Sequence, residues 1–247
     1  MPVDWNDMGP LFAQAFPPSE RSGQGNPAGN LFHEPTRNRY HIDAARTVGR
    51  DMARYLDDIG VAIADAINKW MGMASVVSLV INGPIGTVLP GGVCGPVLKP
   101  LILMRAPLRT EMEIEYSNAI AQAVSDAWKR WEQGLNGVLE YPAFAVAPMP
   151  MAPPTPNVPV PLIMLGSSGE GDLVPSVLAG AMAAAMTSDG QHAGTLFEAV
   201  AIAVYTQFQQ FKTATQVVNV LGTGPVTVPP AGPVTGGSVI PTPGNFL

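Results

Sequence analysis

Three long tracts of the chain contain no charged residue, and their positions limit the possible fold more than any other feature of the sequence. The uncharged tracts cover residues 70–98, 141–169 and 213–247. Each is rich in Pro, Gly, Val or Thr, and each follows a segment with helical periodicity. A helix followed by an uncharged tract, recurring three times in the same order, indicates an internal repeat.

The three helical segments share a local signature. The tripeptide Ala-Ile-Ala occurs at 62–64, 119–121 and 201–203, and an aromatic residue follows seven to nine residues after its first alanine. Around each tripeptide, apolar residues recur at steps of three and four, which is typical of a helix with one buried face. We therefore expect three amphipathic helices, together with a shorter Ala-rich helix over 172–186.

Proline limits what the uncharged tracts can form. It lacks a backbone N–H and fixes φ, so it is excluded from helix interiors and from central strands. The Gly-Pro and Pro-Gly pairs in the tracts are typical of turns. We expect short strands between such turns, and a polyproline II segment over 146–161 that would suit an arm docked on a partner. The predicted strands are 76–81, 162–165 and 216–221.

These patterns predict an α+β fold made of three repeated units, each an amphipathic helix followed by Pro/Gly-rich short strands or an extended arm. The expected units are 39–110, 111–170 and 171–247, and the last contains two helices. A polar and flexible N-terminal arm is expected over 1–38. The pattern leaves open whether the units pack within one chain or between chains.

The composition favours a surface that other subunits cover. Charged residues make up 13% of the chain, about half the usual share of roughly 25%. The alternative is a compact domain whose surface is rich in Thr, Ser and Asn. The net charge of −6 and a pI near 5.0 argue against a nucleic-acid partner, which would require clustered Lys and Arg.

Targeting and redox signals are few. One cysteine, Cys94, excludes an internal disulfide, and its Gly- and Pro-rich surroundings predict a small buried side chain. The first residues lack the basic and apolar regions of a signal peptide. No apolar run approaches the ~20 residues that a membrane span needs. We therefore expect neither a signal peptide nor a transmembrane segment.

The sequence shows no catalytic or cofactor-binding constellation. None of the histidines, His33, His41 and His192, has a second ligand at metal spacing. The loop over 166–172 lacks the spacing of a nucleophile elbow and the Lys of a phosphate loop, and we interpret it as a flexible linker with Asp172 as a helix N-cap. The acidic run over 111–115 predicts an exposed strand edge or a helix start. We expect no metal, no cofactor and no enzymatic activity.

Large apolar side chains in the helices and tracts are the candidate contacts with other subunits. Trp128 and Trp131 lie three apart on one helical face, and such a pair more often belongs to a core than to a binding surface. Methionine in apolar settings is typical of adaptable packing surfaces. The candidate interface residues are Trp70, Trp128, Trp131, Phe208, Phe211, Met149, Met151, Val226 and Val228.

The organisation of the chain resembles that of virion structural proteins of tailed bacteriophages and of phage-derived contractile injection systems. The resemblance lies in the uncharged Gly/Pro/Val/Thr tail over 223–247, the polar N-terminal arm and the expected lack of a signal peptide. It implies a neck, tail, baseplate or capsid-associated subunit. Such a subunit is made in the host cytoplasm, performs no reaction, and binds copies of itself and other structural proteins of a virion or other extracellular assembly.

Two other classes of function stay open at this point. A membrane-active or secreted effector would insert the Ala-rich helix and the apolar tracts into lipid, although the helices lack the basic face of interfacial helices. An enzyme with a noncontiguous site would gather His41, His192 or the acidic run over 111–115 in one pocket.

Overall fold

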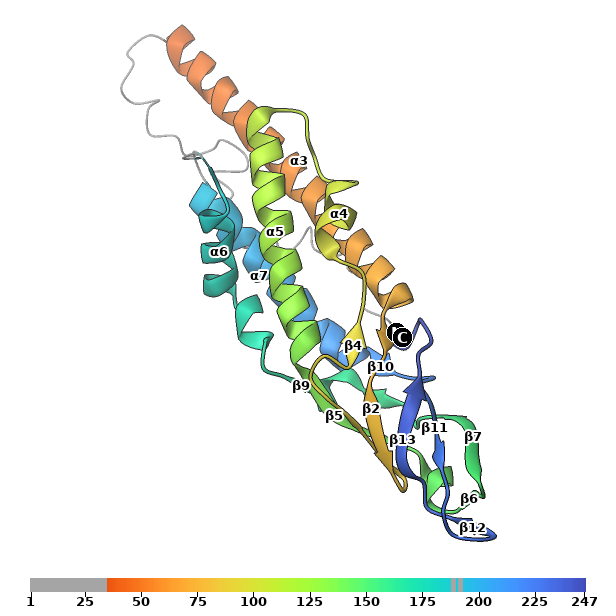
Figure 1. Cartoon of the computed structure of the whole chain (residues 1–247). Coiled ribbons are helices and arrows are strands. Elements are labelled where there is room, and N and C mark those ends of the chain that lie inside the picture. The colour runs from red at the N-terminus through yellow and green to blue at the C-terminus, as the bar shows by residue number, and fades with distance from the viewer. Residues whose placement is uncertain (1–34, 188–189, 191–192) are drawn as a thin grey trace.

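The chain has an elongated α+β fold, with helices at one end and a sheet at the other (Figure 1). The computed structural model describes residues 35–187, 190 and 193–247, and side-chain positions from residue 47 onward. The described helices are α3 (Pro35–Met73), α4 (Leu98–Leu103), α5 (Glu111–Gly134), α6 (Pro175–Ala184) and α7 (Ala193–Ala214). Helix α3 begins at Pro35, inside the segment 1–38 that the sequence analysis assigned to the arm.

Among the described residues, the strands pair in antiparallel fashion. Seven of them form one sheet in the order β7-β11-β13-β2-β3-β5-β9. Three two-stranded ribbons, β1-β4, β10-β8 and β12-β6, flank it. The strands are β1 (Ser75–Val76), β2 (Leu79–Asn82), β3 (Ile85–Val88), β4 (Val93–Cys94), β5 (Leu135–Glu140), β6 (Ala147–Pro148), β7 (Met151–Pro156), β8 (Val160–Pro161), β9 (Gly166–Ser167), β10 (Gln216–Val217), β11 (Leu221–Pro225), β12 (Ala231–Gly232) and β13 (Thr235–Ile240).

The structure does not confirm that the three units repeat one another. Their strands share one sheet: β2 and β3 come from 39–110, β5, β7 and β9 from 111–170, and β11 and β13 from 171–247. The units therefore pack against each other within one chain. The strands that follow α3, α5 and α7 differ in number and take different places in the sheet, so the three units do not have the same structure.

The strand predictions are right in part. Residues 76–81 form β1 and β2 with a break between them, and 216–221 contain β10 and the first residue of β11. The prediction for 162–165 is wrong. Leu162–Met164 form a 3₁₀ turn, in which the Leu165 amide donates to the Leu162 carbonyl at 3.0 Å.

The polyproline II prediction for 146–161 is also wrong, because this segment contains the paired strands β6, β7 and β8. Its prolines are tolerated because β7 is an edge strand of the large sheet, where one side of the strand needs no N–H donors.

Helix starts follow local capping chemistry. The Thr110 hydroxyl accepts from the Glu113 amide at 3.1 Å, and the Glu113 carboxylate accepts from the Arg109 amide at 2.7 Å. The acidic run is thus the start of α5, as one of the two interpretations predicted. Helix α6 begins after Val174 with Pro175 in its first turn. Asp172 is not its N-cap and instead pairs with Arg130.

The core where helices and sheet meet is an aromatic cluster. Trp70 on α3 packs edge-on to Trp128 on α5, with ring centroids 5.2 Å apart, and Phe246 near the C-terminus lies 5.1 Å from Trp70. All members of the cluster are at most 1% exposed. The cluster comprises Trp70, Trp128, Trp131, Phe208, Phe211 and Phe246.

Five of the nine predicted interface residues belong to this cluster: Trp70, Trp128, Trp131, Phe208 and Phe211. Their prediction as contacts with another subunit is wrong, because their rings contact one another inside the chain. The apolar stripes of α3, α5 and α7 face each other here. Periodicity alone does not tell whether such a stripe meets its own chain or another one.

Candidate functional site

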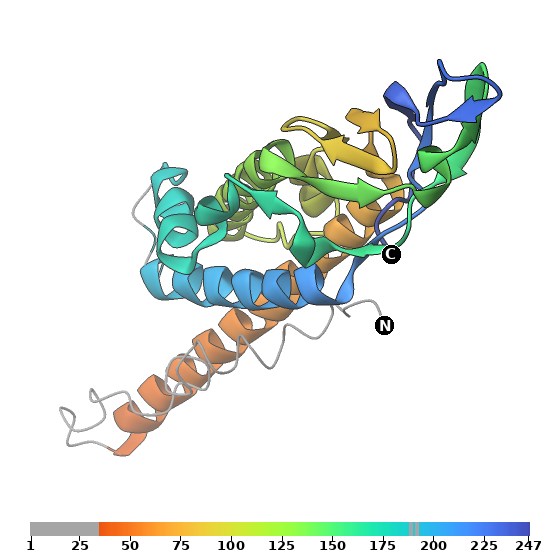
Figure 2. The same ribbon diagram turned by 90° about the horizontal axis from the view of Figure 1, so that it is seen from below.

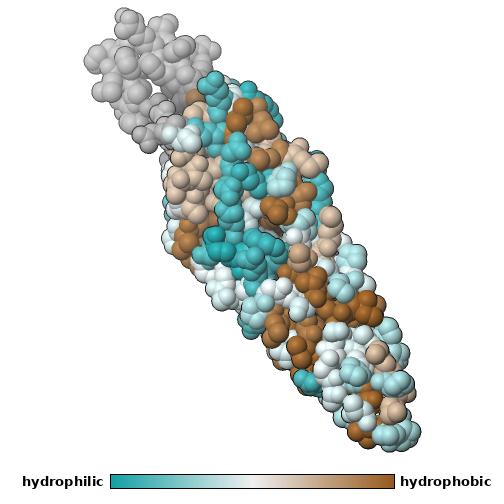
Figure 3. Space-filling view, viewed as in Figure 1, coloured by the Kyte–Doolittle hydropathy of each residue, from teal (hydrophilic) through white to brown (hydrophobic). Residues whose placement is uncertain are grey.

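Charge is segregated along the molecule. The segments 70–98, 134–169 and 213–247 build the sheet and its ribbons, and they contain one charged side chain, that of the exposed Glu140. In Figure 3 the most hydrophilic residues gather over the helices, whereas the β end is mostly pale or brown. Protein–protein interfaces are depleted of charge in their buried centre, so the β end has the composition of a contact surface.

Two of the uncharged tracts meet at the extremity of the β end, where β6 and β12 lie in Figure 1. The Met149 amide donates to the Pro230 carbonyl at 3.3 Å, and the Val226 amide donates to the Pro150 carbonyl at 2.9 Å. We call this pair of segments, 146–151 and 225–232, the apolar tip. Figure 2 shows it from below, projecting away from the helices.

The apolar tip exposes large side chains without any charge. Val146 is 72% exposed, Met149 47%, Met151 57% and Val228 49%. Val226 is buried at 3% and supports the tip from inside. The structure therefore brings together the four predicted interface residues that are outside the aromatic core. Sequence reasoning did not select Val146, although its position in a proline-rich uncharged tract was a usable signal.

The edge strand β7 next to the tip offers few backbone donors to another chain. Strand β7 is an edge of the sheet, and unpaired edges are templates for pairing with other chains. Pro153, Pro154 and Pro156 remove N–H donors from β7. An added strand would therefore find few donors, so another subunit has to contact the faces of this end rather than extend the sheet.

The outer face of the sheet exposes further apolar side chains. Val80 on β2 and Val138 on β5 are both opposite Thr87 on β3, which gives one row across three strands. Val80, Ile85 and Val138 are each more than a third exposed. The face is mixed rather than wholly apolar, because Thr87 lies between the two valines, and Ile85 lies opposite Asn82 and Glu140. None of the three apolar residues was among the predicted interface residues.

Other predicted features have structural roles. The loop over 166–172 is not a free linker: the Ser167 hydroxyl donates to the Trp131 carbonyl at 2.7 Å, and β9 joins the sheet through this loop. In α6, Leu178 and Met182 are buried in the bundle formed with α5 and α7. The Ala-rich helix thus uses its largest apolar side chains inside the molecule. Cys94 was predicted to be buried and is exposed.

A buried carboxylate lies beside the aromatic cluster. Glu132 is 1% exposed, and its carboxylate accepts a hydrogen bond of 2.7 Å from the Trp70 indole N–H. Its other oxygen pairs with Lys129, whose side chain reaches the surface. Both oxygens are thereby satisfied, so this carboxylate fixes the geometry between α3 and α5.

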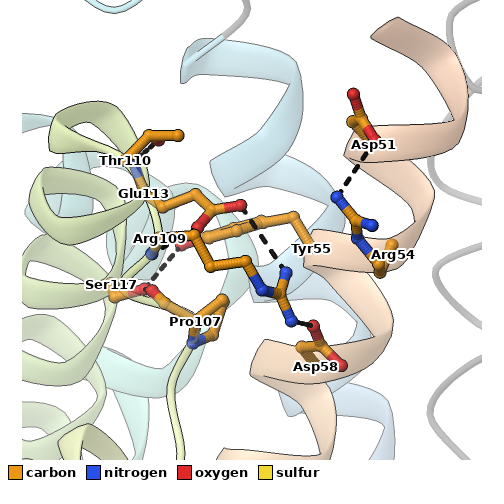
Figure 4. A network of polar contacts seen from close by, with 9 residues as sticks. All are labelled: Asp51, Arg54, Tyr55, Asp58, Pro107, Arg109, Thr110, Glu113 and Ser117. Carbon is orange, nitrogen blue, oxygen red and sulfur yellow. Dashed lines mark hydrogen bonds and ion pairs between the residues drawn. The ribbon is translucent and has the colours of Figure 1, made fainter. Parts of the chain in front are cut away.

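A polar network joins α3 to the start of α5 at the helical end (Figure 4). The Arg109 guanidinium contacts Asp58 at 2.5 Å and Glu113 at 3.7 Å, and Arg54 pairs with Asp51 at 3.0 Å. Except for Glu113, which is 17% exposed, the charged groups in these pairs are more than a third exposed, so water screens the pairs and each contributes little to stability.

Tyr55 is the buried member of this network. The Ser117 hydroxyl donates to the Pro107 carbonyl at 2.8 Å, so the Tyr55 hydroxyl is the donor in its 3.2 Å contact with Ser117. Burial raises the pKa of Tyr55 above its usual value, and burial also raises the pKa of Tyr116. Both side chains stay neutral at physiological pH.

The described part of the chain contains no group of three or more His, Cys, Asp or Glu residues placed to hold a metal ion. The side chains of His33, His41 and His192 lie outside the described side chains, so a pocket gathering the histidines is not tested. Helices in the described ranges are too short or too polar to cross a membrane.

Comparisons with known proteins return no match: no protein-family model, no curated protein and no solved structure is similar to this chain. The function of the chain is therefore inferred from its geometry and its charge distribution.

Proposed function

We propose that this chain is a non-enzymatic structural subunit of a large protein assembly, and that its apolar tip is the main contact with neighbouring subunits. The assembly that fits best is the virion of a tailed bacteriophage, with the chain in a neck, tail, baseplate or capsid-associated position. The neighbours are further copies of the chain and other structural proteins of the same assembly.

The observation that carries the proposal is the apolar tip on an uncharged β end. Val146, Met149, Met151 and Val228 are exposed together, and Glu140 is the one charged side chain in the strands and loops of this end. Contiguous exposed apolar surface marks sites of interaction in soluble proteins. Methionine adapts its shape to a partner, which suits a subunit that meets several neighbours.

The elongated shape supports an assembly role as well. The charged helical end can face water while the β end is covered, so one subunit projects from the contact into solvent. Association through a tip and an outer sheet face produces rings when the rotation between subunits closes, and filaments when it does not.

The experiment that tests the proposal is the native mass of the purified protein, measured by light scattering after size exclusion over a range of concentrations. The wild type should exceed the mass of one chain, 25.9 kDa. A Met149→Asp, Met151→Asp variant should have the mass of one chain, because a charge is costly to bury at a contact. Met104→Asp is the matched control, since Met104 is an exposed methionine at the end of α4.

Two results would contradict the proposal. One is a wild type that stays at the mass of one chain at every concentration. The other is a tip variant that assembles as well as Met104→Asp does.

A further inference from the structure

We propose that an apolar pocket between α3 and α5 is the docking site for the chain's own N-terminal segment 11–16, which carries Leu11, Phe12 and Phe16. This inference concerns the helical end and does not depend on the function proposed for the apolar tip.

The pocket lies where the start of α5 meets α3. It has a volume of about 300 Å³. Its apolar and aromatic lining includes Met52, Tyr55, Met112 and Tyr116, and Val48 lies at its rim. The rings of Tyr55 and Tyr116 meet edge-on with centroids 6.1 Å apart. The α3 and α5 side chains thus form a preformed apolar depression at the surface.

The chemistry of the lining favours an aromatic occupant. Methionine sulfur makes favourable contacts with aromatic rings, and Met52 and Met112 both line the pocket. Tyrosine rings add edge-to-face contacts. An apolar cavity of about 150 Å³ is known to hold one benzene, so a pocket of about 300 Å³ has room for two phenyl rings. Phe12 and Phe16 would supply two.

Charge is compatible with this occupant. The arginines at the pocket, Arg54 and Arg109, already contact the carboxylates of Asp51, Asp58 and Glu113. A charged ligand would have to compete with these ion pairs. The segment 8–19 contains no charged residue, so its docking leaves them intact.

The length of chain before α3 places the segment within reach. Val48 is 13 residues into α3, which is roughly 20 Å along the helix axis at 1.5 Å per residue. Phe16 precedes Pro35 by 19 residues, and a Gly- and Ser-containing tether of that length has a root-mean-square span of roughly 24 Å. A tether that matches its span gives the highest local concentration, so the chain's own segment outcompetes another copy's.

The test is a disulfide-trapping experiment on the full chain in a Cys94→Ser background. Ala13→Cys lies between the two phenylalanines, and Val48→Cys is at the rim of the pocket. The matched control replaces Val48→Cys with Arg50→Cys, which is also exposed on α3 at a similar distance from the start of the helix but lies outside the pocket lining. The rate of disulfide formation is followed by nonreducing electrophoresis, and a mixture of isotope-labelled and unlabelled chains assigns each link to one or two chains.

The inference predicts that the 13–48 link forms at least about tenfold faster than the 13–50 link, and within one chain, because docking raises the local concentration. Adding Phe12→Ser and Phe16→Ser should remove this advantage. Equal rates for the two pairs would overturn the inference, as would a fast link that joins two chains or one that persists without the phenylalanines.

Discussion

At the scale of single residues, the buried carboxylate of Glu132 ties the two longest described helices together. It accepts from the Trp70 indole on α3 and pairs with Lys129 on its own helix. A buried polar group left without its partner costs about 1–3 kcal/mol, more than a typical made hydrogen bond contributes. Glu132 therefore stabilises the fold mainly by accepting the hydrogen bond of the buried Trp70 N–H.

We expect Glu132→Leu to lower the free energy of unfolding by about 2 kcal/mol, because it leaves the Trp70 N–H buried without an acceptor. Glu132→Gln keeps an acceptor oxygen and should cost clearly less. Urea unfolding at neutral pH measures both. Glu140→Gln, an exposed carboxylate, is the control and should be close to neutral. Equal losses for the leucine and glutamine variants would show that the hydrogen bond is not the cause.

Tyr55 predicts a pH dependence of stability. Its folded-state pKa is raised by burial, whereas in the unfolded chain it is about 10. As the pH rises, Tyr55 therefore loses its proton first in the unfolded state. The stability that the neutral, buried Tyr55 contributes is fully present below about pH 10 and is lost as the pH rises above that value.

At pH 7 we expect Tyr55→Phe to be about 1 kcal/mol less stable than the wild type, because the hydrogen bond to Ser117 is gone. The difference should shrink as the pH rises from about 9 to 11, since only the wild type carries the ionisable group at this position. Urea unfolding across this range is the measurement. A difference that stays constant with pH would argue against a buried, neutral Tyr55.

At the scale of elements, the sheet curls around two stacked rings. Tyr141 and Phe144 have centroids 5.2 Å apart, and the Tyr141 hydroxyl donates to the Val220 carbonyl at 3.0 Å. Gly222 on β11 lies against them, because a Cβ there would meet Ile81 at 2.6 Å and the two rings at 2.9 and 3.0 Å. Strand β11 needs glycine at position 222 because the backbone lies so close to these side chains, and not because of an unusual φ.

We expect Gly222→Ala to destabilise the fold by about 1–3 kcal/mol through overpacking. Gly180→Ala is the matched control, since a Cβ at Gly180 in α6 meets nothing within 4 Å. It should stabilise by about 0.5–1 kcal/mol, because alanine favours helix. Thermal unfolding compares the two. A neutral Gly222→Ala would mean that the sheet is not closed on Tyr141 and Phe144.

The sequence predicts an element well when the contacts that form it join residues close together in the chain, and poorly when they join distant residues. Helices α3, α5 and α7 were predictable because apolar residues at steps of three and four are a property of adjacent turns, whereas the six-residue helix α4 was not predicted. The strand order was not, since β13 pairs with β2 across some 150 residues of chain and no local pattern encodes that pairing. The short strands at 216–217 and 221–225 were partly visible as apolar runs, whereas 162–164 became a 3₁₀ turn.

The candidate site was predictable to a similar degree. Met149, Met151 and Val228 were chosen for their apolar, uncharged surroundings, and the structure exposes them together. The aromatic residues were chosen on the same reasoning and are buried inside the chain. A stripe of apolar residues shows that one face of a helix is covered. Whether the same chain or another subunit covers it depends on the tertiary fold. For Trp128 and Trp131, the interpretation as core residues is the one that the structure supports.

At the scale of the whole molecule, the separation of a charged helical end from an uncharged β end determines how association should respond to solvent. Salt screens interactions between charges, and only Glu140 is charged in the strands and loops of the β end. Apolar contacts, in contrast, weaken on cooling.

We therefore expect the dissociation constant of the wild-type assembly to change little, within about twofold, between low and moderate salt, and to rise on cooling. Analytical ultracentrifugation at two salt concentrations and two temperatures measures both. Strong dissociation by salt at constant temperature would place the contact at the charged helical end instead.

The apolar tip should be covered when the subunits associate, and methionine oxidation tests this at the tip residues themselves. Peroxide converts exposed methionines to sulfoxides, and peptide mass spectrometry compares their rates in dilute protein and in the assembly. Met149 and Met151 should become protected in the assembly, while Met104, 72% exposed at the helical end, should react at an unchanged rate. Protection of Met104, with Met149 and Met151 still reactive, would show that association buries the helical end and not the apolar tip.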